Sequence, residues 1–395
     1  MNSTIVEAGC RTAAENKNFN INVLILGKTG VGKSSLVNYL YGRDIAVAKT
    51  GRPVTARGFH RHEPFMYKSL SVTVYDSWGL EADKVSEWYN DLEEECKKAN
   101  SGTIADWFHT VIYCFDAKKS RLDSFEKEHI LDELMKNGVR LIFAMTKWGL
   151  CSEKEKNAAQ ETLKKYYPDL SAVPIESVSQ KLRNQTTTVQ LGRDDLFCEM
   201  CINLRENLIF NLLNITRQKV NSAVNKSKRD VEEYYDEQAG FFTAYGSDLQ
   251  NKIISYAADS YERNVSAAYQ TLSDTYEQIN LMSRSVISSY TGLNLDPEGL
   301  FIRKLVSEEA YKITGWDNSF SEYFYTLLSF TNIPLLIIRR LWIKRSYGEK
   351  ISEKLDEANG SIQGSLDKYF ERILYTEKQF RESFLMKYRT KRNRT

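Results

Sequence analysis

Apolar residues in the first half of the chain form short continuous runs, separated by charged stretches of helical length. The runs occupy residues 21–26, 70–76, 110–116, 140–146 and 171–175. Runs without strict alternation are typical of strands covered on both faces, as in a parallel sheet. The stretches between them, 82–99, 124–137 and 152–166, carry apolar residues at helical spacing. This pattern predicts a doubly wound α/β domain over residues 19–215.

The pattern changes after about residue 195, where long mixtures of polar and apolar residues replace the short runs. One helical face within residues 255–282 collects Tyr256, Tyr261, Val265, Tyr269, Leu272 and Tyr276. We therefore predict an all-α helical domain or stalk over residues 216–385, with a loop near 292–299. Residues 1–18 are polar and lack periodicity, which predicts a flexible N-terminal arm, and residues 386–395 form a basic tail.

A glycine-rich loop follows the first apolar run and precedes the first helical stretch. It matches the pattern G-x-x-x-x-G-K-S with residues Gly27, Lys28, Thr29, Gly30, Val31, Gly32, Lys33 and Ser34, followed by Ser35. Such a loop lets backbone N–H groups surround phosphate oxygens, and the positive end of the helix dipole adds to the attraction. The pattern predicts a nucleotide phosphate site in which Lys33 reaches the β- and γ-phosphates and Ser34 binds Mg²⁺.

The second apolar run ends in the pattern D-x-x-G, formed by Asp76 and Gly79. Here we expect Asp76 to hold Mg²⁺ through water and the N–H of Gly79 to contact the γ-phosphate. Between the two motifs, residues 48–58 are rich in Gly and Thr and ill-suited to regular structure. A threonine there could close onto Mg²⁺ and the γ-phosphate as a switch, with Thr55 the first choice and Thr50 the second. A plain surface loop is the alternative.

The fourth run ends in Thr146 and Lys147, and with these residues the motifs resemble the P-loop GTPases. Their order and spacing resemble the translation-factor-related class, within its Era/septin/dynamin-like breadth. The sequence GKTGVGKSSLVNYL looks most like that of YfjP-type and interferon-inducible (immunity-related) GTPases. The resemblance covers residues 20–215 and implies a P-loop G domain, with a mostly parallel sheet and helices on both faces. It also implies Mg²⁺-dependent hydrolysis of GTP to GDP and phosphate.

The same resemblance implies which residues lie beside the base. Lys147 would place its stem along the base, and Thr146 would tie this loop to the phosphate loop. The sequence ESVS at 176–179 resembles the motif whose backbone N–H groups contact guanine O6, so Ser177 and Val178 are candidates. A core strand that simply ends in a lysine is the alternative for residues 140–151.

Two positions depart from the family pattern. Leu80 stands where Ras-like members carry the glutamine that orients the attacking water. We therefore expect slow turnover that self-association through the G domain, or a partner, accelerates. Gly149 stands where the family has the aspartate that reads guanine, and losing that contact would cost about 1–3 kcal/mol. Glu153, Ser152 and Asp116 are candidate substitutes. Guanine stays favoured by the resemblance, and relaxed base specificity is the alternative.

The second half of the chain and the net charge of the whole chain bear on its possible binding partners. Residues 323–345 join an uncharged stretch, broken at Pro334, to the basic sequence RRLWIKR, and are a poor match to a spanning helix. They predict either a buried bundle segment or peripheral contact with a membrane. A net charge of +2 makes nucleic-acid binding an unfavoured hypothesis.

The sequence also predicts a localisation and leaves a second class of function open. The N-terminus lacks a secretory pattern and the six cysteines are scattered, so we expect a cytoplasmic protein with reduced thiols, with peripheral membrane association as the alternative. A nucleotide-dependent scaffold with negligible hydrolysis is the hypothesis from a different functional class.

Overall fold

The computed structural model divides the chain into two compact units. Unit 1 comprises Met1–Asn211, Gln278–Leu295 and Met386–Thr395, and unit 2 comprises Leu212–Glu277 and Asp296–Leu385. Within them, the structure describes residues 19–46, 58–136, 139–181, 187–238, 247–292 and 336–392.

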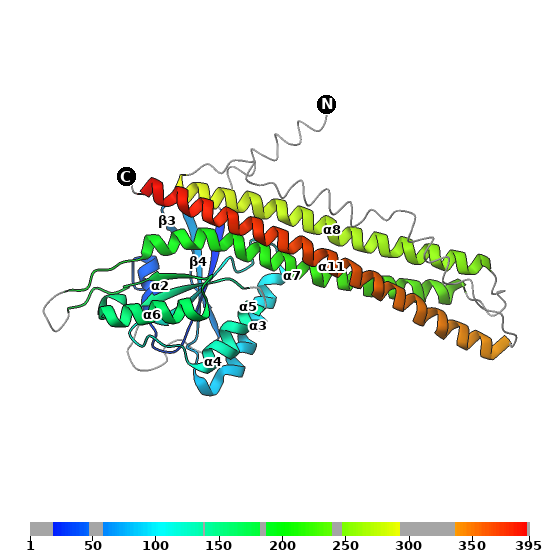
Figure 1. Ribbon diagram of the computed structural model, residues 1–395, viewed down its shortest axis with the longest axis horizontal. Helices are drawn as coiled ribbons and strands as arrows, with labels where there is room; N and C mark the ends of the chain where they lie inside the picture. Colours follow the sequence, from blue (N-terminus) through cyan, green and yellow to red (C-terminus); the bar gives the residue numbers. More distant parts are fainter. Residues whose placement is uncertain are drawn as a thin grey trace, which may run out of the picture. The chain divides into compact units, whose positions relative to one another are not determined.

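Unit 1 contains a seven-stranded sheet (Figure 1). Its strands are β1 (Asn20–Leu26), β2 (Phe59–Arg61), β3 (Phe65–Tyr67), β4 (Leu70–Ser77), β5 (Thr110–Asp116), β6 (Leu141–Thr146) and β7 (Ser171–Pro174). The order is β2-β4-β1-β5-β6-β7, and β3 also pairs with β4. Strands β4, β1, β5, β6 and β7 are parallel, whereas β2 and β3 run antiparallel to β4. The five predicted strands and the predicted fold class are confirmed.

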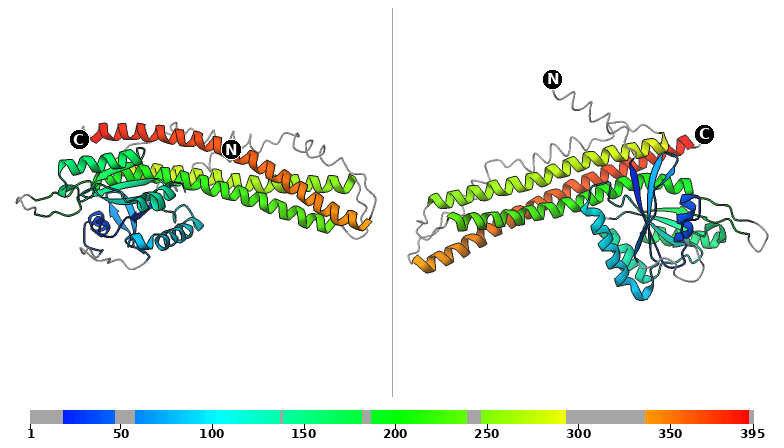
Figure 2. Two further views of the ribbon diagram at one scale, coloured as in Figure 1. Left: turned by 60° about the horizontal axis from the view of Figure 1, so that its bottom comes forward. Right: turned by 180° about the vertical axis from the view of Figure 1, so that it is seen from behind.

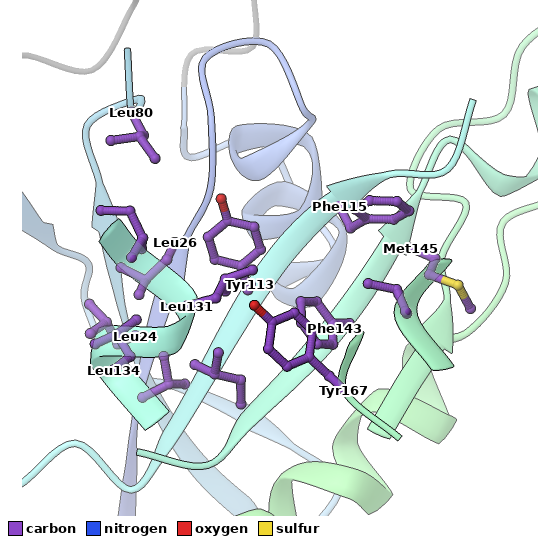
Figure 3. Packing of buried hydrophobic residues seen from close by; sticks show 14 of the residues in the cluster. Leu24, Leu26, Leu80, Tyr113, Phe115, Leu131, Leu134, Phe143, Met145 and Tyr167 are labelled. Atoms are coloured by element: carbon purple, nitrogen blue, oxygen red, sulfur yellow. The ribbon is translucent and has the colours of Figure 1, made fainter. Parts of the chain in front are cut away.

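Alternate residues of the central strands enter two apolar layers. One layer joins strand side chains to residues of the following helices, and it includes Leu24, Leu26, Tyr113, Phe115, Phe143, Met145, Leu131, Leu134 and Tyr167 (Figure 3). The intervening strand residues, among them Val23, Ile25, Ile112 and Ile142, are also buried. Because successive strand side chains point to opposite faces, the sheet is covered on both sides. Burial on both faces explains why the strands read as continuous apolar runs.

The helical segments between the strands lie close to their predicted positions. They are α2 (Lys33–Tyr41), η1 (Ala82–Lys84), α3 (Val85–Ser101), α4 (Ser124–Glu126), η2 (Lys127–Leu131), α5 (Asp132–Lys136), η3 (Trp148–Leu150) and α6 (Glu153–Tyr166). Helix α6 begins at a capping box, in which Ser152 and Glu155 each accept a hydrogen bond from the other's backbone N–H.

Helix α7 (Arg193–Gln238) begins in unit 1, where its first turns pack on the sheet. The hydroxyl of Thr110 donates to the Met200 carbonyl at 3.2 Å, and the Asn207 side chain accepts from the Arg140 N–H at 2.8 Å. Apolar residues from Leu196 to Leu208 of this helix are buried. The helix continues without a break through residue 215, the end that the sequence predicts for the G domain.

Unit 2 consists, in its described part, of stretches of α7, α8 (Ser247–Thr291) and α11 (Leu336–Arg392). Figures 1 and 2 show these stretches side by side. The predicted apolar face of α8 is present, because Tyr261, Val265, Leu272 and Tyr276 are buried. Tyr256 is half-buried and stacks on Tyr234 of α7 with ring centroids 4.0 Å apart. The all-α second half is therefore confirmed.

Several predictions fall wholly or partly outside the described residues. These are the arm 1–18, the switch residues Thr50 and Thr55, the loop near 292–299 and residues 323–335. Residues 336–345 begin α11, and residues 386–392 are its last turns, so most of the predicted basic tail is helical. Within the helices that the structure describes, none is both long and apolar enough to cross a membrane.

Candidate nucleotide-binding site

The predicted site residues meet at one edge of the sheet. Because the central strands are parallel, their carboxyl ends lie along the same edge. Gly27 follows β1, Asp76 lies near the end of β4, Asp116 and Thr146 end β5 and β6, and Glu176 follows β7. This edge is where doubly wound α/β sheets bind their ligands.

The phosphate loop runs from Gly27 to Gly32 and leads directly into α2. Three of its residues have positive φ angles, which are 143° at Gly27, 77° at Gly30 and 105° at Gly32. No side chain caps the first turn of α2, and this turn contains no acidic residue. Its backbone N–H groups and the positive end of the helix dipole are thus left for an anion, with Ser34 and Ser35 in the same turn.

Lys33 lies buried beneath this loop. Its ammonium group donates to the carbonyl of Gly27 at 2.9 Å and to that of Lys28 at 3.1 Å. Burial lowers the pKa of Lys33, and the nearby Asp76 carboxylate opposes that shift. The loop carbonyls therefore hold a cation at the place where phosphate oxygens are expected.

Asp76 offers a buried carboxylate that attracts the ammonium group of Lys33. It is 2% exposed, and its Oδ1 atom has no hydrogen-bond partner among the described residues. Burial raises the pKa of Asp76 to about 6, against the opposing attraction of Lys33. Mg²⁺ prefers oxygen ligands such as this carboxylate and the hydroxyl of Ser34, so these residues fit the predicted ion.

The D-x-x-G segment is hydrogen-bonded directly to the phosphate loop. The N–H of Thr29 donates to the Leu80 carbonyl at 3.2 Å, and the N–H of Leu80 donates to the Gly27 carbonyl at 3.3 Å. A Cβ atom at Gly79 would lie 2.2 Å from the Thr29 hydroxyl oxygen, so only glycine fits there. The side chain of Leu80 is buried in the apolar cluster with Trp78 and cannot orient a water molecule (Figure 3).

Thr146 and Lys147 connect the end of β6 to the same loop. The hydroxyl of Thr146 donates to the Val31 carbonyl at 2.6 Å, which is the tie that the sequence predicts. Lys147 has a φ of 59°, and its ammonium contacts the Gly30 carbonyl at 2.9 Å and Asp116 Oδ2 at 2.6 Å. Asp116 is thus engaged by Lys147 rather than placed as a substitute base reader.

The other two proposed substitutes for the missing aspartate also have different roles. Ser152 is the N-cap of α6 and bonds with Glu155. Glu153 has a side chain that is 81% exposed and pairs with Lys156 at 2.7 Å. No contact joins either residue to Gly149 in the described structure, so their role as substitutes stays a prediction.

The carboxylate beside Gly149 belongs to Glu176, which the sequence reading missed as a site residue. Its Oε2 atom accepts a hydrogen bond from the Gly149 N–H at 2.8 Å. Its Oε1 atom accepts a longer one, of 3.3 Å, from the N–H of Val178, one of the two predicted base contacts. Ser177 lies between Glu176 and Val178 in the sequence, and its carbonyl accepts a hydrogen bond from the side-chain amide of Gln190 at 2.7 Å. The sequence signal that could have identified Glu176 as a site residue is its place as the first residue of ESVS, residues 176–179.

Comparisons with known proteins agree with this geometry. Residues 22–147 match the family model described as 50S ribosome-binding GTPase. GTPase Der of Borreliella burgdorferi is 28% identical over 195 residues, which are 49% of this chain and 41% of that protein. GTPase Der of a Bradyrhizobium species is 26% identical over 166 residues, which are 40% of this chain and 34% of that protein. The chain thus spans less than half the length of these relatives.

A solved structure of Toc33 from Arabidopsis thaliana in complex with GDP and Mg²⁺ is similar over 47% of this chain and 85% of that chain, with 18% identity. Its TM-score of 0.33 is too low to support an inference. The family match takes in the phosphate loop, Asp76, Gly79, Thr146 and Lys147. This part of the chain is therefore a G domain of the P-loop GTPase class.

Proposed function

We propose that the protein binds GTP with Mg²⁺ and hydrolyses it to GDP and phosphate. The proposal rests above all on one observation, which is that Lys33 of the phosphate loop and Asp76 are both buried and attract each other, while Asp76 Oδ1 has no hydrogen-bond partner among the described residues. Neither burial is favourable without a ligand, because both groups lose hydration. A phosphate chain with its divalent ion would give Lys33 anionic acceptors in place of the loop carbonyls, and would give Asp76 a cation.

We propose the following roles, which the positions of Lys33, Ser34 and Asp76 support. Lys33 exchanges the carbonyls of Gly27 and Lys28 for the β- and γ-phosphate oxygens. Ser34 and Asp76 would hold Mg²⁺, which would neutralise charge on the phosphates. Thr55 closes onto the γ-phosphate, and the N–H of Gly79 contacts it. The backbone of residues 27–34 supplies the remaining donors.

Slow turnover is part of the proposal, because Leu80 is buried and offers no polar atom to the attacking water. We propose that self-association through the G domain, or a partner, supplies the missing group. Coupling of nucleotide state to the helical half, and peripheral membrane contact through residues 323–345 of a cytoplasmic protein, are further proposals. The narrower YfjP-type or immunity-related class rests on the wording GKTGVGKSSLVNYL alone.

Substitution of Lys33 tests the hydrolase proposal. We expect Lys33→Ala to reduce phosphate release from GTP by about 100-fold or more, because a cation that stabilises the transferred phosphate is lost. The measurement is phosphate release from GTP, ATP and XTP with Mg²⁺. Lys84→Ala is the matched control, since Lys84 pairs only with Glu81 at 3.1 Å on the surface. Unchanged turnover in Lys33→Ala would contradict the enzymatic role.

The buried position of Leu80 also favours a second candidate, a nucleotide-dependent scaffold with negligible hydrolysis. The two candidates separate in the same experiment. Tight GTP binding that depends on Lys33, without phosphate release at any protein concentration, would favour the scaffold. Release that rises more steeply than protein concentration would favour the self-associating hydrolase.

A further inference from the structure

Gly149 and Glu176 occupy neighbouring positions at the carboxyl ends of two paired strands. Gly149 follows β6 and Glu176 follows β7, and these strands are parallel neighbours. A Cβ atom at Gly149 would lie 2.9 Å from Glu176 Oε2 and 3.2 Å from its Cγ. The carboxylate of Glu176 therefore fills the space that a side chain at residue 149 would need.

The hydrogen bonds of this carboxylate leave acceptor capacity on both oxygens. Oε2 accepts from the N–H of Gly149 and Oε1 accepts from the N–H of Val178. Each carboxylate oxygen can accept two hydrogen bonds, so one position remains on each. Among the described residues, no lysine or arginine forms an ion pair with Glu176, and burial raises its pKa. A buried carboxylate without a cationic partner is a typical feature of functional sites.

Guanine is the base that matches two adjacent acceptors. Its N1–H and its exocyclic amine present two donors side by side, whereas adenine has an acceptor at N1 and xanthine has a carbonyl in place of the amine. Lys147, which lies two residues before Gly149, is already fixed beside the phosphate loop through Gly30. A base attached to phosphates in that loop would thus lie near this part of the sheet edge.

We propose that Glu176 supplies the carboxylate that reads guanine, and that Gly149 is the residue that makes room for it. This role rests on the proposed nucleotide-binding function and deepens it. In the family pattern the base-reading carboxylate belongs to an aspartate at the position of Gly149. Here it comes from Glu176, which lies in a different loop. Glu176 is only 3% exposed, and a Cβ atom at Gly149 would also lie 3.1 Å from Cγ2 of Thr188. Because Glu176 is so little exposed, the residues around it must shift for a base to reach its carboxylate.

The test measures dissociation constants of the full chain with Mg²⁺ for GDP, IDP, XDP and ADP. Wild-type protein should bind GDP about 10-fold or more tightly than the other three, because each lacks one or both donors. IDP lacks the exocyclic amine, so it tests the contact between that amine and the Glu176 carboxylate without any change to the protein. Glu176→Gln should weaken GDP and strengthen XDP, since the amide N–H can donate to the xanthine carbonyl. Glu155→Gln is the matched control, because its carboxylate only caps α6.

A reciprocal pair of variants tests the exchange between the loops. Gly149→Asp alone should lose selectivity, because its side chain collides with Glu176 and two carboxylates repel. Gly149→Asp combined with Glu176→Ser should regain the preference for GDP, so the two substitutions are not additive. Recovery by the double variant is a result that a purely structural role of Glu176 would not produce.

The outcomes separate this proposal from the function on which it rests. If Glu176→Gln weakens the binding of GDP, XDP and ADP equally, Glu176 only holds its loop in place. That result would overturn its role as reader. Equal binding of GDP and ADP by the wild type would overturn that role as well, and would leave nucleotide binding intact. Failure of the wild type to bind any of the four diphosphates would overturn the proposed function itself.

Discussion

Lys33 and Asp76 are two buried charged residues, and burial disfavours the charged form of each. Burial lowers the pKa of Lys33 and raises the pKa of Asp76 to about 6, while their mutual attraction opposes both shifts. In the absence of nucleotide, each residue therefore gives up hydration without gaining a full set of partners. Proteins commonly retain such residues at a cost in stability because ligand binding needs them.

Replacement of Asp76 measures that cost. Its folded pKa lies above the unfolded value of about 3.9, so ionisation removes stability as the pH rises from about 4 to about 6. Above pH 6 the whole penalty is present. We expect Asp76→Asn to raise the free energy of unfolding of the nucleotide-free protein by up to about 3 kcal/mol at pH 7.5, and by much less at pH 4.5. Urea denaturation in EDTA provides the measurement.

The control for this prediction is Asp106→Asn, which alters an exposed carboxylate that bonds only within its own turn. It should show no comparable gain at pH 7.5. A variant at Asp76 that is less stable than the wild type at pH 7.5, or equally stabilised at both pH values, would contradict the assignment of a burial penalty to this carboxylate.

The phosphate side of the site could be predicted from sequence, and the base side only in part. Lys33, Asp76 and Thr146 each belong to a motif that follows directly on an apolar run, so local sequence is enough to place them. The contact between Gly149 and Glu176 joins residues 27 positions apart. It depends on β6 and β7 being neighbours, and strand order is a property of the fold that local patterns do not specify.

Secondary structure elements show the same difference between local and nonlocal information. The five parallel strands were predicted because burial on both faces leaves a continuous apolar run. Strands β2 and β3 were missed, because three residues such as FHR or FMY are too few to show a period. They exist as strands because the backbone of β4 pairs with them in antiparallel fashion.

Arg193, the first residue of α7, links this helix to two elements of the G domain. Its guanidinium donates to the Leu40 carbonyl at the end of α2 and lies 4.4 Å from the ring centroid of Tyr67 in β3. A cation is favourable at a helix C-terminus and over an aromatic face. We expect Arg193→Ala to lower the free energy of unfolding by about 2 kcal/mol, measured by urea denaturation.

Arg121→Ala is the matched control for this element-scale prediction. The side chain of Arg121 is 77% exposed and lies 3.8 Å from Asp123, so its loss should change the stability little. Equal effects of the two substitutions would show that Arg193 does not join α7 to α2 and β3 in a way that matters for stability.

Both units of the molecule contain buried apolar residues, and unit 2 also has polar contacts between its helices. Unit 1 has apolar layers on both faces of a sheet. Ion pairs in unit 2, such as that of Arg217 with Asp367, are exposed, and such pairs contribute about 0–1 kcal/mol. Between α7 and α8, however, the amide nitrogen of Asn264 lies within 3.2 Å of acceptor oxygens of Ser227 and Asp230 in α7, and of Ser260 in its own helix. We infer that this polar cluster aligns the two helices.

Removal of the central amide of this cluster should therefore destabilise the helical unit. We expect Asn264→Ala to lower the free energy of unfolding by about 1–3 kcal/mol, since it leaves partly buried groups without a donor. Burial alone would raise the pKa of Asp230, but hydrogen bonds from Ser260 and Asn264, together with the nearby Lys226 and Arg263, lower that pKa. The contribution of Asp230 is thus present above about pH 4 and lost as the pH falls below its folded pKa.

Urea denaturation of Asn264→Ala at pH 7 and pH 3.5 tests both parts of this prediction, and the deficit should shrink at the lower pH. The control is Asn359→Ala, which removes an exposed amide bonded at 2.9 Å to Asn221 and should cost little at either pH. If both substitutions cost the same at pH 7, the cluster has no special role in unit 2. If the deficit at Asn264 does not depend on pH, the amide acts through the serine hydroxyls rather than through Asp230.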